Sequence, residues 1–515
     1  MVLVSLDGGS RMSGKLIDYS DGMYHVQTSL AAVSAPVGSV TCEGPGCPTF
    51  ELAAFKSDEP AGEEVETEAA LPAPTRLPAD LVMVGSDNLG EDLMPLIMEP
   101  FAEVLDARLS EANEFPDYIA QYIFTPNDGG DPFVLEVEST SSGPGLERLI
   151  AGTTDIAMSS RGAEPDEVAA LAAQGRGNLL DVSQEYVVAV DSVVMIVHPD
   201  NPVDALSRRQ LAGIYSGQIR NWAQVGGPNL EIVPVARPGG SARRNFETWA
   251  FRYRPDPSDN TVIVDGGKKL TRYVMETPGA IGYSISDNVL DSKPIDLILD
   301  CGVRTDASPF KSKAEEYLMG RRIRLYIDNQ NPNPTVRQMT NLMISPEVDD
   351  EVDESGYYSL GIVGDPQGQA RLLDAAVIGQ PQRISRAVQN RIVRELSGAE
   401  RLSLTFRFPT ARWNFDSKAL RDLDRLVEYL GRPGNRDREF IFVGFADARG
   451  DYNYNVQLSL NRANEVLSKV RAHPGGRDLG RTRMSVLGYG EAAPVGCNDN
   501  QVGLAHNRRV EVWVR

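Results

Sequence analysis

Residues 81–109 read LVMVGSDNLGEDLMPLIMEPFAEVLDARL, and they set the fold class of the largest part of the chain. The apolar run LVMV has the length of a buried strand, and the segment GSDNLG from Gly85 interrupts it with small and polar residues. Apolar residues then recur at helical spacing from Leu93. A strand, a glycine-containing loop and a helix in this order predict the opening of an α/β domain.

The same order of patterns recurs further along the chain. It is found in residues 149–160 (LIAGTTDIAMSS), 187–199 (VVAVDSVVMIVHP) and 232–251 (IVPVAR entering GGSARRNFETWAF). Strands that alternate with helices predict a largely parallel sheet. Ligands of open α/β sheets bind at the loops that follow the carboxyl ends of the strands. We therefore expect a two-lobed α/β binding domain over residues 79–364.

Two segments of different composition precede this domain. Residues 1–48 contain short apolar runs between turn residues, and they predict a small antiparallel β domain. Residues 49–78 form an acidic, Pro-rich linker, with six acidic residues between Asp58 and Glu68.

Two further segments follow the α/β domain. Residues 365–399 predict a connector with one helix. Residues 400–515 alternate strand and helix patterns and predict a compact α+β domain. In its last strand Val510, Val512 and Val514 alternate and should face the core.

The formal net charge of −21 over 515 residues argues against a nucleic acid partner. The charge is unevenly distributed, because residues 401–515 carry 19 basic and 13 acidic residues. No apolar run reaches the ~18–20 residues of a membrane span. The start, MVLVSLDGG, lacks the features of a signal peptide, and we expect that such a peptide has been removed from this numbering.

Four cysteines leave two pairings open. Cys42 and Cys47 lie in CEGPGC, where a turn could close a small disulfide loop, or both could be reduced. Cys301 and Cys497 could pair across domains, which their isolation in the sequence does not decide. No second pair of Cys or His lies near Cys42 and Cys47, so we expect no metal site.

Enzyme motifs are missing from the sequence. The chain has four histidines and lacks H-E-x-x-H, G-x-S-x-G and P-loop motifs. We therefore predict that the chain is not an enzyme and has neither catalytic residues nor a cofactor.

Three loops of the α/β domain suggest an anion site. They are residues 85–88 (GSDN), 141–143 (SSG) and 237–243 (RPGGSAR), and each precedes a predicted helix. Helix N-termini offer unpaired N–H donors and a partial positive charge, and Arg237 could add a bidentate contact. Each loop could equally serve only as a helix cap.

These loops resemble those of the periplasmic phosphate-binding proteins of ABC importers, the PstS-like branch of the type 2 binding-protein fold. The matching stretches are residues 140–161, residues 235–246, and IYSGQIRNW in residues 211–227. The resemblance implies phosphate as the ligand and an ABC permease as a partner. It assigns the anion contacts to Ser86, Asn88, Ser142, Gly143, Arg237, Ser241, Ala242 and Arg243.

The sequence departs from this pattern at two points. The family's buried aspartate, which accepts a proton from phosphate, falls near Ser160, and Arg161 follows it. The usual Gly-Thr after the third-loop serine is Ala242-Arg243. A missing acceptor and two added cations favour a fully ionised anion, a larger phosphorylated ligand or an anionic partner. Arg161 and Arg243 could also be ordinary surface residues.

Residues 443–467, 486–494 and 507–514 resemble the OmpA-like peptidoglycan-binding domain. The resemblance implies that Asp447 and Arg462 hold the diaminopimelate of the stem peptide, with Asn455, Leu458 and Arg509 in support. A zwitterionic side group needs one anchor of each sign, and arginine suits a carboxylate. An internal Asp447–Arg462 salt bridge is the structural alternative.

The sequence therefore predicts an envelope or periplasmic protein that binds phosphate or a related oxyanion and is anchored to peptidoglycan. The alternative is a structural or interaction protein whose α/β domain no longer binds a small ligand.

Overall fold

The computed structural model describes residues 74–251, 258–366, 368–370, 372–373, 386–408, 415–480 and 482–515, and the backbone of five strands before residue 44. The chain divides into two compact units, Met1–Ala73 and Pro74–Arg515. No helix within the described ranges has the length and apolar character needed to cross a bilayer. The predicted Cys42–Cys47 pairing lies outside the described residues.

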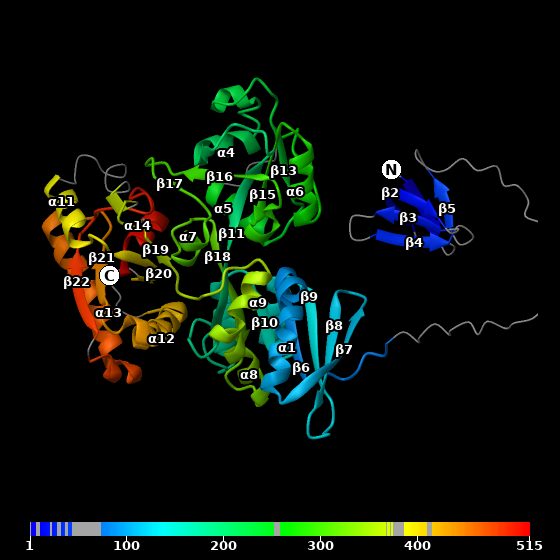
Figure 1. The fold of residues 1–515 in the computed structure, drawn as a ribbon, viewed down its shortest axis with the longest axis horizontal. Coiled ribbons are helices and arrows are strands. Elements are labelled where there is room, and N and C mark those ends of the chain that lie inside the picture. The colour runs from blue at the N-terminus through cyan, green and yellow to red at the C-terminus, as the bar shows by residue number, and fades with distance from the viewer. Residues whose placement is uncertain are drawn as a thin grey trace, which may run out of the picture. The chain divides into compact units, whose positions relative to one another are not determined.

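The first unit is an antiparallel sheet, as its regularly spaced turns predict (Figure 1). Neighbouring strands pair in the order β4-β3-β2-β1-β5. The strands are β1 (Val2–Leu6), β2 (Arg11–Ser20), β3 (Met23–Gln27), β4 (Ala32–Pro36) and β5 (Val40–Glu43).

The second unit begins with a two-lobed α/β domain (Figure 1). Lobe 1 consists of β6 (Leu81–Ser86), α1 (Met94–Val104), β7 (Ala107–Phe115), β8 (Ile119–Pro126), β9 (Phe133–Thr140), α2 (Ser142–Ala151), β10 (Ile156–Ser159), α3 (Pro165–Ala173), α8 (Pro334–Met343) and α9 (Asp349–Glu354). Lobe 2 consists of β12 (Ala205–Ser207), α4 (Arg208–Tyr215), β13 (Val233–Ala236), α5 (Ser241–Ala250), β14 (Val262–Ile263), α6 (Gly267–Glu276), β15 (Ala280–Ile285), β16 (Lys293–Ile298), β17 (Arg304–Thr305) and α7 (Pro309–Lys313).

Two long strands, β11 (Glu185–Val197) and β18 (Gly320–Ile327), join the lobes. The first part of β11 packs into the core of lobe 1, and the part from Val193 packs into the core of lobe 2. All 13 residues of β11 are buried, because both faces of the strand are covered. This burial explains why its sequence is almost continuously apolar.

The expectation of a largely parallel sheet is wrong, because the sheet is mixed. β6 runs parallel to β9 and β10, and β13 runs parallel to β14 and β15. β11, however, is antiparallel to β15, β16 and β18. The β7–β8 and β8–β9 pairs are also antiparallel, since these strands follow one another through short connections. Strand patterns predicted β6, β10, β11 and β13 but not the direction in which each strand runs.

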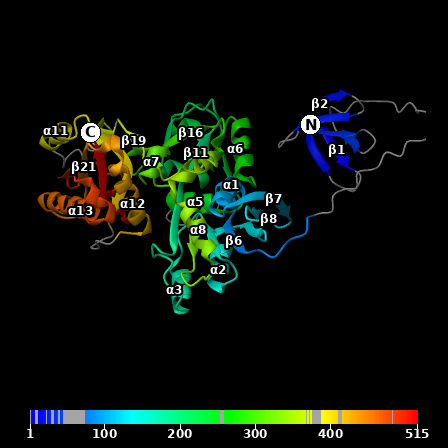
Figure 2. The same ribbon diagram turned by 60° about the horizontal axis from the view of Figure 1, so that its bottom comes forward.

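The C-terminal domain is a five-stranded sheet with helices on both faces (Figure 2). Helices α12 and α13 pack on one face, and α11 packs on the other. The elements are β19 (Gly364–Asp365), α11 (Arg386–Glu395), β20 (Glu400–Arg407), α12 (Ser417–Gly431), β21 (Glu439–Gly444), α13 (Tyr452–Ala472), β22 (Arg483–Gly488), α14 (Gln501–Asn507) and β23 (Arg509–Val514).

The core pattern predicted for this domain is largely confirmed. Val510, Val512 and Val514 all lie in the core between the sheet and α12 and α13. Leu458 of α13, a supporting position of the OmpA-like pattern, is partly exposed and outside that core. It lies in the second turn of α13, before the residues of that helix that pack on the sheet.

The C-terminal domain is bonded to lobe 2. Cys301 and Cys497 form a disulfide across 196 residues of sequence. Nearby, the Glu315 carboxylate pairs with Arg322 at 2.5 Å and with Arg407 of β20 at 3.3 Å. Burial opposes ionisation of Glu315, but Arg322 and its other cationic neighbours hold its pKa well below the ordinary value.

The same domain also contacts lobe 1. The guanidinium of Arg421, on α12, donates to the Val182 carbonyl at 2.6 Å and lies 4.1 Å from the centre of the Tyr186 ring. The Ser417 hydroxyl, at the start of α12, donates to the buried Glu185 carboxylate. The C-terminal domain therefore has contacts to both lobes.

We expect the Cys301–Cys497 disulfide to stabilise the second unit, because it closes a loop of 196 residues. Replacing both cysteines by alanine should lower the free energy of unfolding by about 2–5 kcal/mol. Chemical denaturation of the full chain with and without reductant measures this change. Reductant should lower the free energy of unfolding of the wild-type chain more than that of the double variant, which lacks this disulfide. Equal stability of the two chains under oxidising conditions would contradict the expectation.

Candidate functional site

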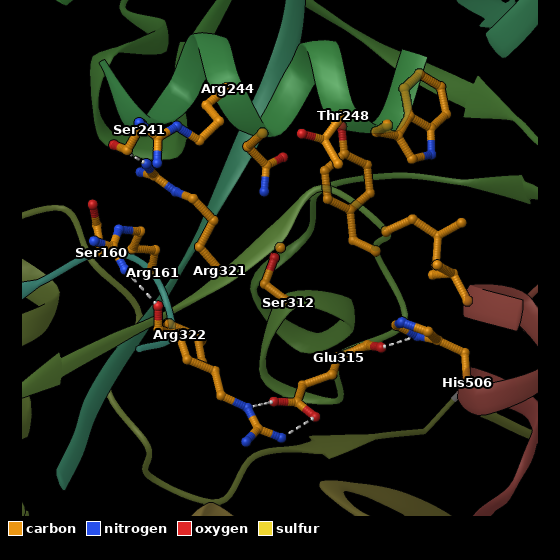
Figure 3. Close-up of a pocket in the computed structure, with 18 of the residues that line it drawn as sticks. Ser160, Arg161, Ser241, Arg244, Thr248, Ser312, Glu315, Arg321, Arg322 and His506 are labelled. Carbon is orange, nitrogen blue, oxygen red and sulfur yellow. Dashed lines mark hydrogen bonds and ion pairs between the residues drawn. The ribbon is translucent and has the colours of Figure 1, made fainter. Parts of the chain in front are cut away.

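A cavity of about 1150 Å3 lies between the two lobes and extends to the C-terminal domain (Figure 3). The first residues of α2 and α5 line it from opposite lobes. Residues of lobe 1, lobe 2 and β18 that line this inter-lobe part include Ser142, Ser160, Arg161, Ser241, Arg244 and Arg321. Four of them, Ser142, Arg161, Ser241 and the substituted Ser160, are positions that the sequence singled out, and the predicted Gly143 also lines the cavity.

In lobe 1 the start of α2 lies close against β6. β9 ends at Thr140, and Ser141 is extended, so the helix begins at Ser142. A Cβ atom at Gly145 would lie 2.5 Å from the Val84 carbonyl oxygen, so only glycine allows this approach. The packing directs the first turn of α2 toward the cavity.

Ser142 and Ser160 form a small hydroxyl cluster in lobe 1. The Ser160 N–H donates to the Ser142 Oγ at 3.1 Å, and the two hydroxyl oxygens are 3.3 Å apart. Both residues are less than a tenth exposed. Either hydroxyl can donate or accept a hydrogen bond, so this cluster can bind an oxyanion and does not need a carboxylate to do so.

Arg161 lines the cavity, but its charge is paired. Its guanidinium donates to Glu167 at 2.6 and 2.8 Å and to the Gly162 carbonyl at 2.9 Å. The hydrogen bonds to Glu167 raise the pKa of Arg161. Arg161 is therefore a weaker anion anchor than its sequence position suggested.

In lobe 2 the N-terminus of α5 faces the cavity. Gly240 precedes the helix with φ +96°, a conformation that favours glycine. Among the described residues, no side chain caps this N-terminus. The first turn of a helix has unpaired N–H groups, and those at Ser241, Ala242 and Arg243 are free of intrahelical partners. The Ala242 side chain itself is buried in the lobe 2 core.

Arg321, on β18, was not found by sequence reasoning. Its Nη1 donates to the Ser241 Oγ at 2.7 Å, and its Nη2 pairs with Asp191 of β11. The two side chains are 6% and 1% exposed, and burial raises the pKa of the Asp191 carboxyl although Arg321 opposes that shift. The Arg321 Nε is buried and has no partner in the described structure. Figure 3 shows the side chain pointing toward Ser241, with Ser160 and Arg161 on the neighbouring loop.

The other two arginines predicted from the third loop lie outside the cavity lining. Arg243 pairs with Glu247 at 2.6 Å, one turn along α5, and donates to the Arg237 and Pro238 carbonyls. The Arg237 guanidinium lies beside Gly240, its backbone N–H donates to the Tyr283 hydroxyl, and its Nε is buried without a partner among the described residues. The structure brings both side chains next to the start of α5 without placing them on the cavity wall.

The first predicted loop contributes differently. Ser86 is the last residue of β6 and is 1% exposed. The Asn88 side chain donates to Asp92 at 3.3 Å. Neither residue lines the cavity, whereas Asp87 between them does.

A second candidate site lies at the end of β21 in the C-terminal domain. The Asp447 carboxylate pairs with Arg508 at 2.8 Å and accepts from the Arg449 N–H at 3.1 Å. Arg462, on α13, donates to the Phe445 carbonyl at 3.4 Å. Burial and the neighbouring Arg508 lower the pKa of Arg462 to about 10. The ion-pair partner of Asp447 is thus Arg508 and not Arg462. Sequence reasoning missed Arg508.

The supporting positions of this second site are held by buried polar contacts. The Asn455 amide donates to Glu491 at 2.7 Å. Arg509 is buried, pairs with Glu511 at 2.7 Å and lies 4.1 Å from the centre of the Phe445 ring. These contacts fix the loop after β21, which carries Asp447.

Two protein families match this chain in separate segments. The PBP superfamily domain matches residues 117–347, and the OmpA family matches residues 407–508. The chain therefore combines a PstS-like binding-protein domain with a C-terminal OmpA domain, and the two-lobed α/β and α+β fold classes predicted from the sequence are confirmed.

The chain is similar to several named proteins. It is 31% identical over 174 residues to the phosphate-binding protein PstS of Bacillus subtilis, covering 34% of this chain and 54%, about half, of that protein. It is 25% identical over 238 residues to PstS of Borreliella burgdorferi, covering 44% and 78% of the two chains. Outer membrane porin F of Pseudomonas fluorescens is 31% identical over 108 residues, 20% of this chain and 31% of that protein.

Solved structures are also similar. The match to an ABC-type phosphate transport receptor from Vibrio cholerae has a TM-score of 0.41 and 23% sequence identity, and it covers 54% of this chain and 99% of the other.

Proposed function

We propose that this chain binds phosphate or a related oxyanion between its lobes and is held on peptidoglycan by its C-terminal domain. The observation that carries the proposal is the convergence of Arg321 with two helix N-termini. The α2 and α5 termini face one cavity from opposite lobes, and the buried Arg321 reaches Ser241 from between them. Such a site supplies hydroxyl, guanidinium and backbone donors to one anion.

The range of electrostatic interactions explains how a chain of net negative charge binds an anion. The cavity-facing donors act over a few ångströms, whereas exposed acidic side chains more than a Debye length away, about 8–10 Å, are largely screened by salt. The PstS relatives are named for phosphate binding, which supports phosphate as the first ligand to test. An ABC permease is the partner that this function would require.

The proposal includes export of the protein to the cell envelope. The Cys301–Cys497 disulfide suits an oxidising compartment such as the periplasm. In the OmpA domain, Asp447 and Arg462 would take the ammonium and carboxylate groups of a diaminopimelate side chain. Arg508 would then share or release Asp447 when the ligand ammonium binds.

The alternative is an interaction protein without a small ligand. One observation favours it, because both cations added relative to the PstS-like pattern are already neutralised, Arg161 by Glu167 and Arg243 by Glu247. The binding measurements below separate the two functions.

We expect the full chain to bind inorganic phosphate, measured by titration calorimetry, and Ser241→Ala to weaken that binding about 5- to 150-fold. The magnitude corresponds to the ~1–3 kcal/mol lost when a buried group is left without its partner, here the anion oxygen that the Ser241 hydroxyl would contact. Ser110→Ala, which removes an exposed hydroxyl on β7, is the matched control. Unchanged affinity in Ser241→Ala would reject this site, and no heat with phosphate or sulfate would favour the interaction protein.

For the second site we expect Asp447→Ala and Arg462→Ala each to abolish co-sedimentation with purified peptidoglycan. Each variant removes one of the two charges that a zwitterionic ligand needs. Arg449→Ala, which removes an exposed arginine of the same loop, should bind normally. Thermal melts establish that the variants are folded. Retention of binding by both variants would rule out this peptidoglycan site.

A further inference from the structure

The cavity extends well beyond the point where an oxyanion would bind. Its volume of about 1150 Å3 lies at or above the ~300–1000 Å3 of pockets that hold organic ligands. A single tetrahedral anion would contact Ser142, Ser241 and Arg321 and leave most of this space unfilled. The remainder of the cavity runs along α5 toward the C-terminal domain (Figure 3).

Helix α5 presents one continuous polar face to this space. Each residue on the face has a neighbour on the same face three or four positions away, which is the spacing of one side of a helix. These residues are Ser241, Arg244, Asn245, Thr248 and Trp249. The opposite side of the helix, with Ala242, Phe246 and Ala250, is buried in the lobe 2 core. From Ser241 to Trp249 the helix advances about 12 Å, longer than one phosphate.

The groups beyond the anion site are suited to an uncharged, hydroxyl-bearing molecule. Asn245 lines the cavity, and its buried Oδ1 has no hydrogen-bond partner within the described structure. Thr248 adds an exposed hydroxyl, and Trp249 adds an aromatic surface. Aromatic, amide and hydroxyl groups together complement a polar organic ligand such as a sugar.

Charged side chains in this extension are largely paired with one another. Asp300 pairs with Arg208 at 2.6 Å, and Glu315 pairs with Arg322 and Arg407. Burial and the adjacent Arg407 lower the pKa of His506 to about 3, so its ring is neutral at physiological pH. The extension therefore offers little net charge to attract a second anion.

The C-terminal domain supplies the far wall of the same cavity. Val502 and His506 of α14 line it, and the Cys301–Cys497 disulfide fixes this wall to lobe 2. Figure 3 shows His506 across the cavity from α5, beside Glu315. The complete pocket exists only when both domains are present.

The anion end also differs from a site for protonated phosphate. Ser160 places a hydroxyl, not a carboxylate, at this end of the cavity, 3.3 Å from the Ser142 hydroxyl. Asp191 is already paired with Arg321. At neutral pH inorganic phosphate carries a proton that needs an acceptor, whereas the dianion of a phosphate monoester has none. The hydroxyl and guanidinium donors at this end thus favour the ester, although Asp87 also lines the cavity.

We propose that the cavity binds a phosphate monoester with an uncharged, hydroxyl-bearing organic part, as in a sugar phosphate. The phosphoryl group contacts Ser142, Ser241 and Arg321, and the organic part lies along α5 against the wall formed by α14. This inference rests on the proposed anion-binding function and specifies its ligand class.

The test is calorimetric titration of the full, disulfide-intact chain with inorganic phosphate, glycerol 3-phosphate, glucose 6-phosphate and glucose. We expect at least one ester to bind ten-fold or more tightly than inorganic phosphate, and glucose alone not to bind. Thr248→Ala and Trp249→Ala should reduce this advantage at least three-fold while leaving phosphate affinity unchanged. Thr125→Ala, on β8 and off the cavity lining, is the matched control.

The outcomes separate the two proposals. If inorganic phosphate binds as tightly as both esters, the inference is overturned while the anion-binding function stands, and Asp87 becomes the candidate acceptor. If an ester binds more tightly but neither α5 variant alters its advantage, the position of the organic part is wrong and the inference fails. If none of the anions binds, the proposed function and the inference fall together.

Discussion

Arg321 and Asp191 form an ion pair where they lie opposite each other on the antiparallel strands β18 and β11, and neither side chain is more than 6% exposed. Removing both charges from water is unfavourable, and loss of one partner leaves an uncompensated buried charge that costs about 3–5 kcal/mol. The pair therefore persists only because the two strands that join the lobes hold it in place. Its geometry directs the second guanidinium nitrogen to Ser241 and so fixes the cation of the site between the lobes.

A second constraint comes from the C-terminal domain. It is bonded to lobe 2 through Cys301–Cys497 and contacts lobe 1 through Arg421 and Ser417. Lobes of binding proteins commonly move about the strands that join them. In this chain, a domain attached to both lobes limits their separation and also forms one wall of the cavity. Under the proposed function, peptidoglycan binding and ligand binding use neighbouring parts of the same domain, because Asp447 pairs with Arg508, the residue directly after α14.

The sequence predicted those features whose cause is local. The strand at residues 81–86, the helix at residues 94–104 and the alternation in the last strand reflect periodic burial, so they could be read directly. The helical reading of residues 107–109 was wrong, because β7 begins at Ala107. The Arg243–Glu247 pair also lies at helical spacing and could have been anticipated. Arg321 could not be assigned, because its partner Asp191 is 130 residues away and Arg321 is one of three arginines in β18. Asp191 within the apolar run of β11 is nevertheless a signal, since a buried charge needs a partner. The direction of β11 and the wall formed by α14 depend on tertiary packing, which no local pattern records.

The most direct measurement is a crystal structure of the full chain grown with saturating inorganic phosphate. The account predicts one phosphate between the lobes, with its oxygens within hydrogen-bonding distance of the Ser142 and Ser241 hydroxyls and the Arg321 guanidinium. A phosphate bound elsewhere, or a cleft without an anion at saturating concentration, would contradict it.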